Sequence, residues 1–200
     1  MKKIISKMFD NWYIYLLIVA LSITIWTTIF KNLKEPNKNE KVEITYFGEY
    51  LDNKLLKNDL LEMLEKENYN NIKKVSITCH NVSENKYYFK KLLMSRIYQS
   101  DLIMIDNNLI DNNFASTYFE PLDVNILNSY SQNITYYKEN NKEYGILLDV
   151  NENGTFSKYL KNSTYLFVCS NSYNVAKIYG VGNENDDMAL KVISYLLKKD

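Results

Sequence analysis

The first long hydrophobic pattern in the chain is an uncharged run at residues 12–30, WYIYLLIVALSITIWTTIF. At ~1.5 Å per residue, a helix of this length just spans the roughly 30 Å of hydrocarbon in a bilayer. The run is apolar on every face, and aromatic residues near both of its ends suit the membrane interface. It therefore predicts a single transmembrane helix.

Two other interpretations of this run are a cleaved signal peptide and a buried core helix. The run is longer than the apolar part of most signal peptides, and residues 27–30 contain no small-residue cleavage motif. A polar linker at 31–41 then separates it from the rest of the chain. We expect a short cytoplasmic N-terminus at 1–11, an anchor at 12–30 in the cell membrane, and an exported domain at 42–200.

Beyond the linker, strand and helix patterns alternate. Residues 42–47 and 73–82 are rich in β-branched and aromatic residues, which favours strands. Helical apolar stripes follow them from about Asn53 and Ser83. Residues 102–105 are apolar at every position, as in a central parallel strand covered on both faces. This order predicts an α/β domain, a single Rossmann-like lobe with a mostly parallel sheet and helices on both faces.

The second half of the domain continues this mixture. Residues 134–150 alternate about a charged turn as a hairpin, and residues 164–170 form another buried strand. The chain closes on an amphipathic helix with Asp186 and Asp187 at its start and Lys198 and Lys199 at its end.

Composition narrows the range of partners. The chain has 24 Lys and Arg and 24 Asp and Glu, so it has no basic excess to bind a nucleic-acid backbone. We expect no nucleic-acid partner. The sequence contains no glycine-rich loop of the kind that binds phosphate, which also argues against a nucleotide cofactor.

Candidate metal and catalytic residues are few. Residues 149–154, DVNENG, begin like a calcium loop, but Leu160 stands where the bidentate carboxylate belongs, and a strand ending in an Asn-Gly turn explains the same residues. His80 is the only histidine, and Cys79 beside it points to the opposite face of a strand. A pair between His80 and Cys169 is geometrically possible, but we expect free, structural thiols and no enzyme, metal or cofactor.

Several stretches resemble the extracellular solute-binding proteins of ABC importers, which have the type II periplasmic-binding-protein fold. These are VEITYF with its following helix, SDLIMID, FEPLD, NKEYGILLDVN and NENDDMALKVISYLL. Leu147 replaces the usual proline after Tyr-Gly-Ile, both Trp residues lie in the anchor, and the exported part has the size of one lobe rather than two. A single lobe cannot enclose a solute by hinge closure.

The resemblance implies a ligand site at the carboxyl edge of the sheet, where open α/β sheets place their crevices. Its candidate residues are Tyr46, Gly48, Asp106, Asn107, Tyr144 and Asp149. It implies non-catalytic solute binding linked to transport, with a membrane permease or another surface protein as partner. The alternative is a membrane-tethered scaffold whose degenerate half-cleft docks a partner or a second copy.

Overall fold

The computed structural model of the chain describes residues 12–69, 72–82, 86–130, 134–150, 155–172, 174 and 187–198. The chain divides into two compact units, Met1–Asn37 and Lys38–Asp200. The first contains helix α2, Trp12–Lys34, and the second contains the sheet and the other helices.

Helix α2 contains the apolar segment Trp12–Phe30, which is long and apolar enough to cross a membrane. The hydroxyls of Ser22, Thr24 and Thr28 donate to backbone carbonyls one turn earlier, at 2.7–2.8 Å. The helix thus satisfies these polar groups internally, as a lipid environment requires. A signal sequence near the N-terminus also meets these criteria of length and composition, and the topology predicted for the chain stays a prediction.

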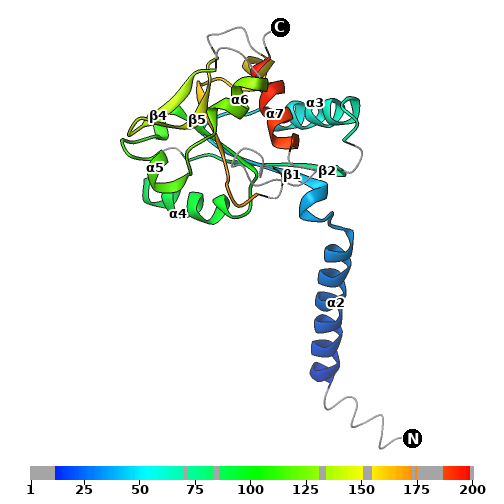
Figure 1. Cartoon of the computed structure of the whole chain (residues 1–200). Coiled ribbons are helices and arrows are strands. Elements are labelled where there is room, and N and C mark those ends of the chain that lie inside the picture. The colour runs from blue at the N-terminus through cyan, green and yellow to red at the C-terminus, as the bar shows by residue number, and fades with distance from the viewer. Residues whose placement is uncertain are drawn as a thin grey trace, which may run out of the picture. The chain divides into compact units, whose positions relative to one another are not determined.

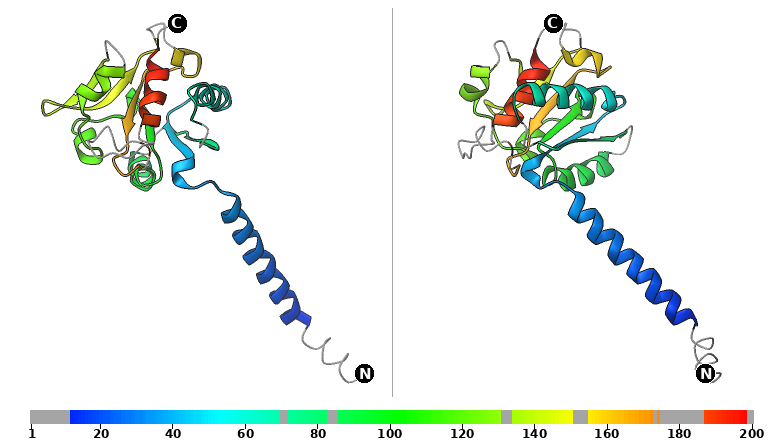
Figure 2. Two further views of the ribbon diagram at one scale, coloured as in Figure 1. Left: turned by 45° about the vertical axis from the view of Figure 1, so that its right-hand side comes forward. Right: turned by 90° about the vertical axis from the view of Figure 1, so that its right-hand side faces the viewer.

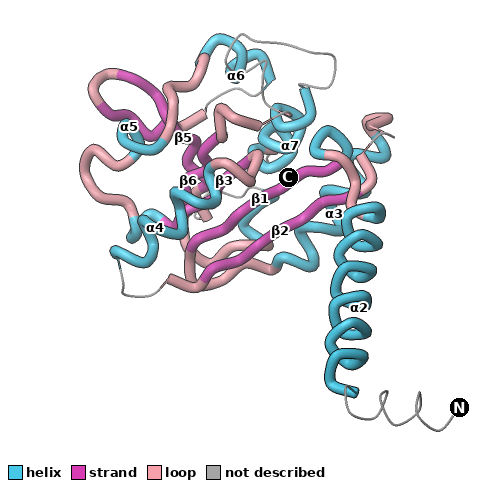
Figure 3. The backbone as a smooth tube through the Cα atoms, turned by 90° about the horizontal axis from the view of Figure 1, so that it is seen from below, coloured by secondary structure: helices cyan, strands magenta, loops and turns pink. Residues whose placement is uncertain are grey.

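The second unit is built on a six-stranded sheet with the order β2-β1-β3-β6-β5-β4 (Figures 1 and 3). Its strands are β1 Lys41–Phe47, β2 Lys74–His80, β3 Leu102–Asp106, β4 Tyr136–Glu139, β5 Lys142–Leu148 and β6 Thr164–Val168. The three strands β1, β2 and β3 are parallel, but β6, β5 and β4 join them through antiparallel pairings. The sheet is therefore mixed.

This mixed sheet corrects one sequence-based prediction. The α/β class is confirmed, but a mostly parallel, Rossmann-like sheet is wrong. The chain reverses at the hairpin between β4 and β5, in which Asn140 and Asn141 have φ values of 49° and 58°. It reverses again after β5, because β6 starts at the edge where β5 ends, and β6 therefore runs against both β5 and β3 instead of continuing the strand-helix-strand pattern.

Helices cover both faces of the sheet (Figure 2). One hydrophobic cluster joins the sheet to α3, α6 and α7, and the other joins it to α4 and α5. The helices are α3 Asn53–Lys66, α4 Lys86–Ile97, α5 Ala115–Tyr118, α6 Val124–Tyr130 and α7 Asp187–Leu197, with single 3₁₀ turns at Lys38–Glu40, Asn107–Leu109 and Thr155–Lys158. Leu102 and Met104 belong to the first cluster, Ile103 and Ile105 to the second, which confirms β3 as a central strand.

Candidate functional site at the carboxyl edge of the sheet

Four strands bring their ends together at one edge of the sheet. The parallel strands β1 and β3 end there, and so does β5, whereas the antiparallel strand β6 begins there. In the register of the sheet, Asp106 pairs with Thr164, and Thr164 pairs with Leu148. The residues that follow β1, β3 and β5 therefore meet the start of β6.

The centre of this edge is the carboxylate of Asp106, which is fully buried. Its Oδ1 accepts hydrogen bonds from the Tyr46 hydroxyl at 2.7 Å and the Thr164 hydroxyl at 3.0 Å. Its Oδ2 accepts from the backbone N–H of Glu49 at 3.1 Å and from Asn162 Nδ2 at 3.2 Å. Donors supplied by the chain itself thus occupy both oxygens, and this is how a buried carboxylate is tolerated.

Gly48 lies directly against this network. A Cβ atom at position 48 would lie 2.2 Å from the Tyr46 hydroxyl oxygen and 2.4 Å from Cγ of Asp106. Its N–H donates to the His80 carbonyl at 3.2 Å, which continues the pairing of β1 with β2. Glycine is needed here because the backbone approaches two buried side chains too closely for any other residue.

Tyr46 is buried, so its ring is not available as a flat surface for a ligand. Burial, and then the hydrogen bond to Asp106, raise the pKa of the Tyr46 hydroxyl far above its ordinary value. Its backbone partner is Tyr50, whose carbonyl and N–H both lie within hydrogen-bonding distance of the hydroxyl. Tyr46 therefore remains a neutral donor that fixes the turn after β1.

The other predicted residues divide into two groups. Asn107 donates its N–H to the Ser163 carbonyl at 3.1 Å, and the Ser163 hydroxyl donates to Asp149 Oδ1 at 2.8 Å. Asn107 and Asp149 therefore lie at the carboxyl edge beside Asp106. Tyr144 does not, because Gly145 pairs with Phe167, and this pairing places Tyr144 near the opposite edge. Its ring is buried in the aromatic cluster beside α5.

Two residues of the network were not among the sequence-based candidates. Thr164 is a polar residue at the start of an otherwise apolar strand, TYLFV, and this isolated hydroxyl was the available signal for it. Asn162 gave no signal of its own in an Asn-rich chain. The contact of each with Asp106 crosses more than fifty residues of sequence, so no local pattern reports it.

The remaining candidate pair, His80 and Cys169, is separated by the fold. His80 lies at the carboxyl end of β2 and stacks on Phe47 with ring centroids 5.3 Å apart, whereas the N–H of Cys169 donates to the Asp101 carbonyl at the opposite edge. Burial, and then the charge of Arg96, lower the pKa of His80. Both thiols are free, and burial raises the pKa of each, which favours the unreactive protonated form.

Within the described residues, no group of three or more His, Cys, Asp or Glu side chains is placed to hold a metal ion. The predicted calcium loop includes residues 151–154, which lie outside the described residues. Of that loop, Asp149 is described, and its carboxylate accepts the hydrogen bond from Ser163.

The hydrogen bonds of Asp106 thus hold the strand ends at this edge together. Because these bonds occupy both carboxylate oxygens, an incoming ligand must displace a donor of the chain to reach Asp106. A comparison of the chain with protein families, curated proteins and solved structures found no match.

Proposed function

We propose that the chain is a membrane-tethered, non-catalytic docking protein whose α/β domain binds its partner through the outer face of α4. Helix α2 acts as the tether in this proposal. The observation that carries it is a stripe of exposed, mostly apolar side chains on α4, where a soluble domain normally presents polar residues.

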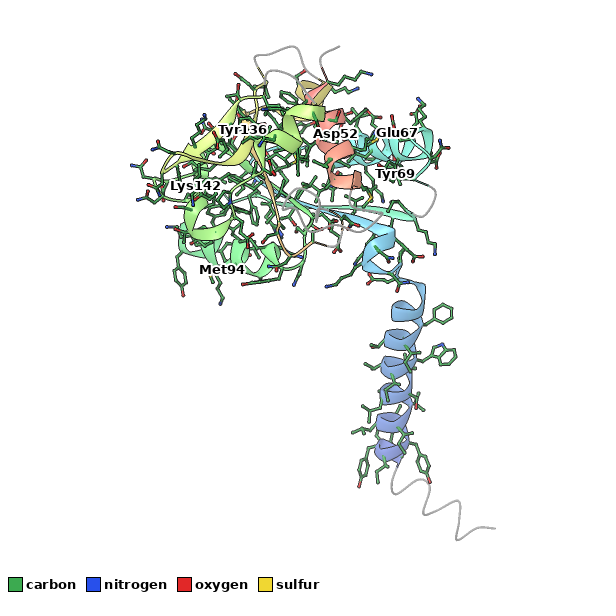
Figure 4. All side chains as sticks on the ribbon, viewed as in Figure 1. Asp52, Glu67, Tyr69, Met94, Tyr136 and Lys142 are labelled. Carbon is green, nitrogen blue, oxygen red and sulfur yellow. The ribbon has the colours of Figure 1, made fainter. Side chains whose placement is uncertain are left out.

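The stripe consists of Tyr87, Lys91 and Met94 on α4 and Tyr98 just after it. At 3.6 residues per turn, their spacing places these four side chains within an arc of roughly 60°. Tyr87 is 80%, Met94 56% and Tyr98 69% exposed. The opposite side of the helix packs Phe89 and Leu93 into the core. Met94, labelled in Figure 4, lies on α4 at the surface of the domain. We call these four residues the α4 face.

The carboxyl edge supports docking over solute capture. The Asp106 carboxylate is committed to donors of the chain and Gly48 lies directly against it, so a solute has to displace one of those donors to reach the carboxylate. Docking through an exposed helix needs neither a second lobe nor hinge closure.

Solute binding linked to transport, with a permease as partner, is the second candidate. The observation in its favour lies on the outside of the same edge, where Lys161 Nζ is 4.3 Å from the ring centroid of Tyr50. Tyr50 is 42% exposed, so an aromatic ring and a cation are available to a solute there.

Cysteine labelling in native membranes tests the docking proposal. Met94→Cys, in a Cys79→Ser background, is labelled with a membrane-impermeant maleimide before and after detergent solubilisation. We expect labelling to be several-fold slower in the membrane. The matched control is Lys57→Cys, an exposed position on α3, which packs on the other face of the sheet. Equal labelling rates at position 94 in both conditions contradict the proposal.

The same preparation distinguishes the second candidate. Thermal unfolding of the full chain is followed with sugars, amino acids, peptides and calcium, since a ligand that binds only the folded state raises the midpoint. The docking proposal predicts no shift. A reproducible shift that is lost in a Lys161→Ala variant establishes solute binding instead.

A further inference from the structure

The segment that carries the α4 face has a local excess of basic residues, one of which, Lys91, lies within the face itself. Residues 86–99, KYYFKKLLMSRIYQ, contain four basic and no acidic residues, whereas the whole chain has 24 of each. Asp111 Oδ2 lies 3.9 Å from Lys90 Nζ, and Arg96 Nη1 donates to Gln99 at 3.0 Å. Lys91 is exposed in the centre of the apolar stripe.

This chemistry matches an interfacial surface better than a dry protein interface. Tyrosine places its ring in the headgroup region of a bilayer and keeps its hydroxyl in water, and methionine adapts to disordered chains. A lysine within such a stripe extends its ammonium group toward lipid phosphates while its methylene stem covers apolar surface. The centre of a protein interface, in contrast, is depleted of lysine.

The tether brings a bilayer within reach of the domain. Residues 31–37 separate the apolar run from Lys38. At no more than ~3.5 Å per residue, they keep Lys38 within roughly 25 Å of the end of that run. A bilayer that holds α2 is therefore present at a high effective concentration, and a weak surface affinity is enough for docking.

We infer that the partner of the α4 face is the surface of an anionic lipid bilayer, the one in which α2 is anchored. This inference rests on the proposed docking function and names the occupant of the same face. Tyr87, Met94 and Tyr98 enter the headgroup region, and Lys91 contacts lipid phosphate.

The test uses the full chain in nanodiscs. Met94→Cys in the Cys79→Ser background carries an environment-sensitive fluorophore, and Cys169 stays unlabelled because it is buried. Discs contain either phosphatidylcholine alone or phosphatidylcholine with phosphatidylglycerol, each with and without a headgroup-proximal spin-labelled lipid as quencher. We expect quenching at position 94 in the anionic discs that is several-fold stronger than in the neutral discs. The label at Lys57→Cys is expected to show no quenching in either.

Two changes probe the charge and the apolar parts separately. Lys91→Gln lowers the ratio of docked to free domain roughly fivefold, since each lysine near an anionic surface contributes on this scale. Raising the salt concentration has the same direction of effect. Tyr98→Ser weakens quenching without removing its salt dependence. Both positions are exposed, so neither change removes a core contact.

The alternative outcomes are distinct. Equal quenching in neutral and anionic discs overturns the role of lipid charge. No quenching at position 94 in any disc overturns the lipid inference. If position 94 is nevertheless protected in native membranes, a protein or a second copy of the chain occupies the α4 face, and the docking function stands. If position 94 is accessible both in the discs and in native membranes, the docking function itself is contradicted.

Discussion

Asp101 and Asp106 lie just before the start and at the end of β3, and both are buried, but the fold holds them in different ways. Asp106 receives four hydrogen bonds from donors in and beside β1 and β6. Asp101 receives three, from the Glu43 N–H at 2.6 Å, Asn174 Nδ2 at 3.0 Å and the Ser172 hydroxyl. Two of its three donors belong to the chain that follows β6.

The difference has an electrostatic consequence at Asp101. Burial raises the pKa of Asp101 to about 6, although the hydrogen bonds from Ser172, Glu43 and Asn174 act in the opposite direction. Within the described residues, Oδ1 of Asn174 finds no donor, so this end of the strand also leaves one buried acceptor unsatisfied. At the carboxyl edge both oxygens of Asp106 accept two hydrogen bonds each, whereas the amino edge has a carboxyl group that takes up a proton near pH 6.

The largest expected effect is the loss of the Asp106 carboxylate. Asp106→Ala leaves four donors without their acceptor, and we expect it to lower the free energy of unfolding by roughly 3–5 kcal/mol. Chemical denaturation of the full chain in detergent measures this. The control is Asp123→Ala, an exposed residue whose carboxylate accepts the Asn125 N–H at the start of α6, for which we expect about 1 kcal/mol. Equal losses in the two variants contradict the network.

The next effect is a dependence of stability on pH that comes from Asp101. The folded state binds this proton more tightly than the unfolded state, whose pKa is 3.8. Protonated Asp101 therefore stabilises the fold fully below pH 3.8, and this contribution disappears as the pH rises through about 6. The two pKa values differ by an amount equivalent to roughly 3 kcal/mol.

Asp101→Asn removes this proton exchange. Between pH 4 and pH 7 the unmodified chain loses the contribution of protonated Asp101, and the variant does not. We therefore expect the free energy of unfolding of the variant, relative to that of the unmodified chain, to rise by up to roughly 3 kcal/mol over this range. Urea unfolding at a series of pH values measures the difference, and Asp123→Asn controls for the change in net charge. A difference that does not vary with pH means that Asp101 titrates alike in the folded and unfolded states.

The smallest of the three effects comes from Gly48. In Gly48→Ala the added methyl group forces Tyr46 or Asp106 to move, and we expect a loss of about 2 kcal/mol in the free energy of unfolding. Adding Tyr46→Phe removes the nearest atom, so the double variant is expected to lose less than the sum of the two single losses. Additive losses contradict a shared network.

The sequence predicted much of the fold through local periodicity. The apolar run of α2, the stripes of α3 and α7 and the all-apolar β3 were identified correctly, because burial of one face or of both faces leaves a direct pattern. The candidate edge was also largely predictable, since Gly48 and Asp149 each follow a strand and Asp106 ends one. Tyr144 was misplaced because its position depends on the direction of β5.

The sequence by itself determined which segments form helices and strands and which strand lies at the centre of the sheet. Only the tertiary structure decided that β6 runs against β3 and that the oxygens of Asp106 are occupied by hydrogen-bond donors of the chain. The hydrogen bond between Tyr46 and Asp106 spans 60 residues of sequence. Periodicity reports the environment of a residue, but the choice of its partner depends on how distant segments pack, and no local pattern encodes that choice.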